Sequence, residues 1–173
     1  MHEQILAYWK RNKDFFRPWV PTYPDNYFTE ENTKEFLDTA WMMTLRRQIL
    51  YLAIFLKEDK DFGCVLGDLT YSHIQRGSSH SCFLGYKMDE AANGKGYVTE
   101  AIQAANEYLF KKWKLHRIDA NIMPHNKRSL RVVEKLGFEN EGLARKLLKI
   151  NGKWQDHIRF GLVNDAMSEQ IGV

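Results

Sequence analysis

A glycine-spaced turn between an expected strand and an expected helix constrains the fold of this chain more than any other stretch. Residues 92–101 read ANGKGYVTEA, with two glycines one residue apart, Gly94 and Gly96. Glycine lets the backbone turn tightly and leaves its N–H groups open, and the helix that follows directs its positive end at the same place. The stretch therefore predicts an anion site, in the first place for phosphate. A plain strand-to-helix connection gives the same Gly-x-Gly spacing, so the rest of the chain must decide.

The patterning on both sides of this turn predicts a mixed sheet. Six segments have the apolar content or alternation of strands: 51–56, 65–74, 80–88, 117–123, 138–150 and 154–163. Four segments have apolar residues at helical spacing: 2–16, 29–48, 97–113 and 127–136. The order of a strand, a helix and a second strand around the turn implies that the two strands pair in parallel across a right-handed crossover. Asn151-Gly152 predicts a hairpin between the last two strands. We expect an α+β (mixed α/β) fold with a mostly antiparallel sheet of about six strands, a central crossover and flanking helices.

Length and composition narrow the class of protein. The 173 residues are 44% hydrophobic, enough to bury one sizeable core, and predict a single domain over 1–173. A net charge of +3 argues against a dedicated nucleic-acid binder, and the basic run around Lys111–Arg117 is typical of a solvated helix end. Two cysteines, Cys64 and Cys82, are too few for a disulfide scaffold or a structural zinc site and are expected to be free, buried thiols. No apolar run approaches the roughly 20 residues of a membrane span and no signal-peptide pattern is present, so we expect a cytoplasmic protein without metal.

An irregular connection joins the first two expected helices. Residues 17–26 carry three of the four prolines together with two large aromatic residues, Trp19 and Tyr23. Prolines exclude regular structure here, and such a loop often lines a pocket. Packing of both rings over the core is the equally weighted alternative, because aromatic side chains are commonly half-buried.

Two blocks of residues resemble the GCN5-related N-acetyltransferase superfamily, and within it the RimJ/RimL-type ribosomal-protein alanine N-acetyltransferases. The first block, residues 93–98 (NGKGYV), stands where the superfamily has Gln/Arg-Gly-x-Gly-x-Gly/Ala, the loop that holds the acetyl-CoA pyrophosphate. The second is residues 123–129 (MPHNKRS) followed by 134–138 (EKLGF), which match the family's Asn-x-x-Ser helix and its Leu-Gly-Phe ending. Shorter similarities extend the resemblance over nearly the whole chain.

The chain also departs from this family pattern. Asn93 and Val98 replace the expected Gln/Arg and small residue, so the grip on phosphate must come from backbone N–H groups. Val133 stands where many members have the tyrosine that protonates the departing thiolate. The strand that normally precedes the first helix is not seen, which leaves a sheet edge for another chain or segment to cover; a homo-oligomer is one such arrangement.

The resemblance implies direct transfer of an acetyl group from acetyl-CoA to a primary amine. It assigns cofactor binding to groups at one strand end, in the glycine turn with the helix start behind it, and at the start of the helix expected over 127–136: Tyr86, Lys87, Met88, Gly94, Lys95, Gly96, Tyr97, Val98, Thr99, Asn126 and Ser129. Ser129, near the CoA sulfur and three residues after Asn126, is the expected acid for the thiolate. Ordinary N-cap duty for Asn126 and an ordinary first-turn serine are the alternatives.

The resemblance does not identify the proton acceptor or the amine substrate. Glu100 is the expected base or substrate contact, but an acidic residue in a first helical turn also complements the helix dipole. His73, His80 and His125, Asp156, or a path through water, are the alternatives. The expected acceptor is a protein N-terminus, in particular of a ribosomal protein, contacted by Trp19, Tyr23 and Trp154. A polyamine or antibiotic amine gripped by Asp25, Glu30 and Glu31, or a non-catalytic CoA-binding module, would fit the same residues.

Overall fold

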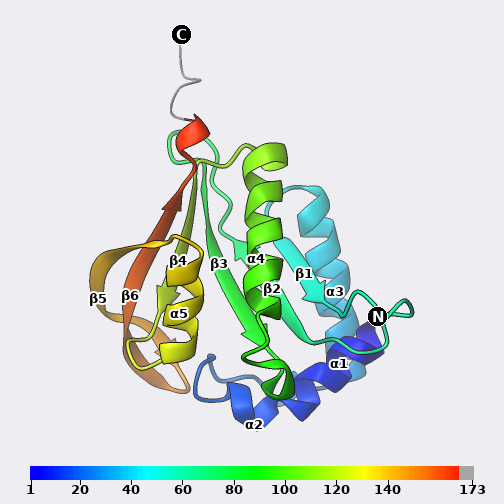
Figure 1. The fold of residues 1–173 in the computed structure, drawn as a ribbon. Coiled ribbons are helices and arrows are strands. Elements are labelled where there is room, and N and C mark those ends of the chain that lie inside the picture. Colours follow the sequence, from blue (N-terminus) through cyan, green and yellow to red (C-terminus); the bar gives the residue numbers. More distant parts are fainter. Residues whose placement is uncertain (168–173) are drawn as a thin grey trace.

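The computed structural model describes residues 1–167 as helices packed on both faces of one sheet (Figure 1). The α-helices are α1 (His2–Arg11), α2 (Lys13–Phe16), α3 (Glu30–Leu45), α4 (Tyr97–Tyr108) and α5 (Lys127–Lys135). The strands are β1 (Leu50–Ile54), β2 (Gly67–Ser72), β3 (Ser81–Met88), β4 (Arg117–Ile122), β5 (Glu139–Ile150) and β6 (Lys153–Val163). Every expected strand forms within a few residues of its predicted bounds, and the mixed, mostly antiparallel sheet is confirmed.

Two of the predicted helices are interrupted. The first, expected over 2–16, breaks at Asn12, whose side-chain amide donates to Asp89 Oδ2 (2.9 Å) while its Oδ1 accepts the N–H of Glu90 (2.9 Å). This tie to the segment before the glycine turn depends on residues nearly 80 positions away, so helical periodicity could not reveal it. The helix expected over 97–113 is α-helical only to Tyr108 and ends in a π-helical turn, Leu109–Trp113.

The sheet has the strand order β1-β2-β3-β4-β6-β5, with one parallel pair. That pair, β3 and β4, is joined only between residues 81–83 and 117–119, although both strands run further. Beyond Phe83 the two strands separate and open a fork in the middle of the sheet. The fork lies at the carboxyl ends of the parallel strands, the end at which ligands bind in sheets of this kind.

Two apolar clusters fix the helices on the two faces. On one face Ile102 and Leu109 of the α4 segment and Val133 of α5 pack against the strands, and on the other Ile5, Tyr8 and Trp9 of α1 pack with α3. Strand β1 shows the alternation that this requires: Leu50 and Ile54 face the first cluster, and Tyr51 faces the second. The sheet is therefore covered on both sides.

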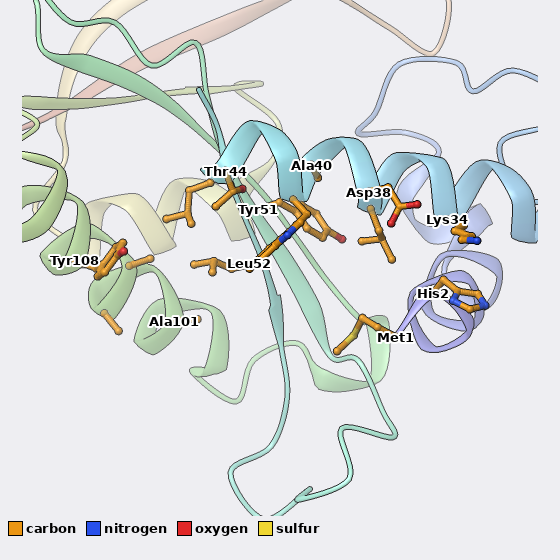
Figure 2. A pocket seen from close by; sticks show the side chains of 15 residues that line it. Met1, His2, Lys34, Asp38, Ala40, Thr44, Tyr51, Leu52, Ala101 and Tyr108 are labelled. Atoms are coloured by element: carbon orange, nitrogen blue, oxygen red, sulfur yellow. The ribbon is translucent and has the colours of Figure 1, made fainter. Parts of the chain in front are cut away.

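Strand β1 is at the edge of the sheet and pairs only with β2 within residues 1–167. A groove of about 760 Å³ runs along it, lined by α3, β1 and α4. Figure 2 shows Tyr51 and Leu52 of β1 between these two helices, with Met1 and His2 at one end. The free edge expected from the sequence is thus present.

The two cysteines lie in different surroundings. Cys82 is buried, and burial raises the pKa of its thiol to about 12. Cys64 is exposed, so the expectation that both thiols are buried was wrong: the turn after β1 leaves Cys64 at the surface. Among residues 1–167, no helix is both long and apolar enough to cross a bilayer.

Candidate active site

The glycine turn presents a row of unused backbone donors. Gly94 and Gly96 have φ of +77° and +86°, the left-handed region that favours glycine, and a Cβ at either position would meet open space. Within residues 1–167 the N–H groups of residues 94–99 have no hydrogen-bond partner. Gly96 is the N-cap of the 12-residue helix α4, so the helix dipole adds positive potential at the same place. The geometry is that of an anion site.

The side chain of Asn93 stabilises this turn through hydrogen bonds to the preceding backbone. Its amide donates to the carbonyl of Asp89 at 2.8 Å and lies within 3.5 Å of the carbonyls of Met88 and Glu90. Asp89 in turn accepts from Arg11 and Asn12, and although burial alone would raise the pKa of Asp89, these hydrogen bonds lower it overall. The end of β3 is thereby tied to α1, and any grip on an anion is left to the backbone.

Strand β3 directs two further N–H groups into the fork. Two hydrogen bonds show which residues of this segment face which neighbour. The N–H of Asp89 donates to the carbonyl of Leu66 on the β2 side (2.7 Å), and the carbonyl of His80 accepts the N–H of Arg117 on the β4 side (3.2 Å). Successive residues of a strand point their N–H groups in opposite directions, so those of Tyr86 and Met88 point towards β4, which has already diverged. The N–H of Lys87 points towards β2 instead.

A cleft of about 730 Å³ fills the fork and reaches both faces of the sheet. On the face of α4 and α5 it is lined by Val98, Ser129 and Val132, and on the opposite face by Asp14 and Phe16 of α2. Asn93, at the start of the glycine turn, lines it as well. Two reactants can therefore enter from opposite sides and meet at the diverging strands.

The first turn of α5 forms one wall of the cleft. Asn126 caps this helix, because its Oδ1 accepts the N–H of Ser129 at 3.2 Å. The hydroxyl of Tyr86 donates to the carbonyl of Ser129 at 3.1 Å and so ties α5 to β3. Burial raises the pKa of Tyr86 to about 12, although the hydrogen bond with Ser129 acts in the opposite direction. Val133 is fully buried in the core and faces no ligand.

The irregular loop after α2 forms the opposite wall. Trp19 lies beside His125, with ring centroids 5.5 Å apart, and both line the cleft. The carbonyl of Val20 accepts the N–H of Asn151 at 3.1 Å, which ties the loop to the β5–β6 hairpin. The prediction that this loop lines a pocket is borne out for Trp19.

Several residues singled out in the sequence lie elsewhere. Tyr23 stacks on Tyr27, with centroids 3.9 Å apart, and does not line the cleft. Trp154 is 62% exposed on β6, and Glu100 is exposed on α4; neither is among the lining residues, nor are His73 and His80. Helical phase places Glu100 and strand phase places Trp154, while Tyr23, His73 and His80 lie in loops; in each case the position relative to the cleft depends on the packing of distant segments.

One lining residue, His157, was not among the candidates from the sequence. It is 3% exposed on β6 and pairs with Ala144 of β5. Its Nδ1 lies 3.0 Å from the carbonyl oxygen of Gln155. The sequence holds one signal for it: His157 alternates with Gln155 on one face of the predicted strand 154–163.

One trio of potential metal ligands lies outside the cleft. His2, Glu3 and Glu30 bring one ligand atom each within 4.8 Å of one another, with His2 Nε2 and Glu30 Oε1 3.1 Å apart. These side chains are half-buried to exposed. None of the three lines the cleft.

Free backbone donors thus lie at the start of α4 and in the fork, where they suit a phosphate and a carbonyl oxygen. Residues 2–139 match the family described as acetyltransferase (GNAT) domain, and the chain belongs to this family. It is accordingly an acetyltransferase that acts on nitrogen.

Relatives that match over most of their length point the same way. A probable N-acetyltransferase of Bacillus subtilis, YjcK, is 37% identical over 162 residues, 94% of this chain and 88% of that protein. The ribosomal protein uS5 alanine N-acetyltransferase of Escherichia coli is 35% identical over 90% of this chain and 78% of its own length. The crystal structure of a ribosomal-protein-S5-alanine acetyltransferase from Vibrio fischeri superposes with a TM-score of 0.89 at 34% identity, covering 95% and 88% of the two chains. RimJ of Mycobacterium smegmatis, solved with a CoA disulfide, shares the fold (TM-score 0.86, 23% identity, 98% and 81% covered).

Proposed function

We propose that this chain transfers the acetyl group of acetyl-CoA to the N-terminal α-amine of a protein, with a ribosomal protein that begins with alanine as the leading acceptor. The fork between β3 and β4 is the observation that best supports this reaction. It combines free backbone donors with a cleft that opens to both faces of the sheet. The names of two relatives at 34–35% identity support the acceptor.

Cofactor binding is assigned to the turn and the start of α4. The N–H groups of residues 94–98 surround the point to which the helix dipole is directed, so they suit the pyrophosphate of acetyl-CoA. Because the glycines have positive φ and open space above them, a phosphate can approach the backbone closely. Lys95 is exposed and adds a positive charge beside the turn.

Polarisation of the thioester carbonyl is assigned to the N–H groups of Tyr86 and Met88. A donor fixed in the backbone of a strand needs no reorganisation as charge develops on the carbonyl oxygen, and removal of one such donor from an enzyme typically costs two to three orders of magnitude in turnover. Strand β2 holds β3 in register on its other side, which keeps these donors fixed.

Protonation of the departing thiolate is assigned to Ser129. Its carbonyl and its N–H are both held, by Tyr86 and by Asn126, which fixes the backbone of Ser129 in the cleft wall. Asn126 contributes by capping α5, and the tyrosine that many relatives use cannot act here because Val133 takes its place.

The charge of the cleft supports a protein N-terminus over a polyamine. Asp14 is the one carboxylate among the lining residues, against the basic Lys87, Lys127 and Arg128. Asp25, Glu30 and Glu31, which could have gripped a polycation, do not line the cleft. A polyamine or an aminoglycoside would meet mostly like charge.

An acceptor screen tests the proposal. The protein is incubated with acetyl-CoA and peptides beginning with Ala, Ser or Met, or with spermidine, while thiol release is followed and products are weighed by mass spectrometry. We expect acetylation of the alanine peptide at its α-amine and none of the same peptide with a blocked N-terminus. Faster turnover of spermidine than of every peptide would overturn the assignment.

A further inference from the structure

His157 is the most enclosed of the chain's histidines. Of the six, His157 is buried, while the others are half-buried or exposed. It nevertheless lines the cleft, on the side of β4 and β6, across the fork from the β3 donors. An imidazole that is shielded from bulk water and faces a reaction cleft can act on a proton there.

A hydrogen bond to the backbone fixes which ring nitrogen is available. A carbonyl oxygen can only accept, so the 3.0 Å contact with Gln155 requires that Nδ1 carries the proton and donates it. Nε2 of the neutral ring then holds the lone pair. Within residues 1–167, Nε2 makes no hydrogen bond to the protein, and it is not one of the fully buried polar atoms that lack a partner. Because His157 lines the cleft, Nε2 faces the cleft.

Burial keeps the ring neutral at physiological pH. Burial lowers the pKa of His157, and the nearby His125 acts in the same direction, while the hydrogen bond with Gln155 and the neighbouring Asp156 oppose it. Asp156 is partly engaged, because its Oδ1 accepts the N–H of Lys146 at 2.7 Å. The other charged groups that line the cleft are Lys87 of β3, Asp14 of α2, and Lys127 and Arg128 of α5, with the basic ones in the majority.

We propose that His157 Nε2 is the proton acceptor for the incoming amine. This inference rests on the proposed function. The ammonium R–NH₃⁺ gives one proton to Nε2, the amine nitrogen then forms the C–N bond with the acetyl carbon, and the C–S bond breaks. A second proton passes from that nitrogen through the Ser129 hydroxyl to the thiolate, the third stays on the amide, and His157 returns its proton to water. Glu100 takes no part, because it is exposed outside the cleft.

The wild-type protein offers a first test without substitution. Nitrogen-15 NMR of the imidazoles distinguishes the two tautomers, and His157 should be neutral with its proton on Nδ1 at pH 7 and should protonate below the usual pH range for histidine. A ring protonated on Nε2, or positively charged at pH 7, would overturn the proposal whatever the acceptor proves to be.

The pH dependence of turnover offers a second test. His157→Gln should lower turnover at pH 7 by about 100-fold or more, the usual range for a lost base. The deficit should shrink towards pH 9, because an α-amine with a pKa near 8 is then largely neutral without help. An equal deficit at both pH values, or less than a twofold effect at pH 7, would contradict a proton-accepting role.

Controls separate this inference from the proposed function. His73→Gln, at an exposed position outside the cleft, should match the wild type at every pH. Thermal unfolding and acetyl-CoA binding by calorimetry show whether His157→Gln is folded. Glycinamide is assayed beside the alanine peptide: turnover of glycinamide with the expected pH shift supports the His157 role even where the peptide is not acetylated, which would count against the proposed acceptor alone.

Discussion

The cleft between β3 and β4 and the groove beside β1 enclose nearly equal volumes, about 730 and 760 Å³, but they are lined differently. Free N–H groups and hydroxyl, amide and imidazole side chains line the cleft. The groove is lined mainly by apolar side chains, among them Leu37, Trp41 and Leu52. Volume therefore does not distinguish the reaction site from the groove in this molecule. The cleft differs because it holds polar groups that are fixed in place and have no hydrogen-bond partner.

Both hollows arise because a strand lacks a neighbour. In the cleft, β3 and β4 diverge after three residue pairs, and the freed backbone donors point into an enclosed space. At the groove, β1 ends the sheet, and the side chains of α3 and α4 overhang its free edge. Trp41 (64% exposed) and Tyr108 (48%) remain open to solvent.

The largest effect on this comparison is expected from Gly96→Val. The substitution forces a β-branched residue into a backbone with φ of +86° and places its side chain where the phosphate must approach. We expect at least a 100-fold loss of acetyl-CoA affinity by calorimetry. Gly77→Val is the matched control, because Gly77 also has positive φ (+66°) and open space but lies in the turn before β3. Equal affinity in the two variants would mean that the turn at Gly96 does not bind the cofactor.

A smaller and more selective effect is expected from Ser129→Ala. Loss of the hydroxyl should lower turnover at saturating substrates about 10- to 100-fold while the affinity for acetyl-CoA changes little, because the backbone contacts of this residue remain. Steady-state kinetics with calorimetry separate the two quantities, and Ser79→Ala in the β2–β3 turn serves as the control. Unchanged turnover would remove Ser129 as the acid.

The smallest effect is expected in the groove. Trp41→Gln should leave turnover and both substrate affinities within about twofold and alter the free energy of unfolding by less than about 0.5 kcal/mol, since the side chain is mostly exposed. The same change at Trp19, which faces the cleft beside His125, should raise the KM for the acceptor peptide several-fold. If Trp41→Gln reduces turnover more than Trp19→Gln does, the functional division between the two hollows is wrong.

The sequence by itself determined the local structure. Glycines at positions 94 and 96 permit a left-handed turn, Asn126 caps a helix through its own side chain, and alternation marks the strands, because each of these depends on neighbouring residues. The capping of α5 by Asn126 is confirmed.

Tertiary structure decided which side chains reach the cleft. His157 faces it, while Glu100, Tyr23 and Trp154 do not. The break at Asn12 depends on Asp89, some 77 positions away. Such placements follow from strand register, from the divergence of β3 and β4, and from contacts between distant segments. A local sequence pattern sets the direction of a side chain only relative to its own helix or strand, and the packing of those elements decides what that direction meets.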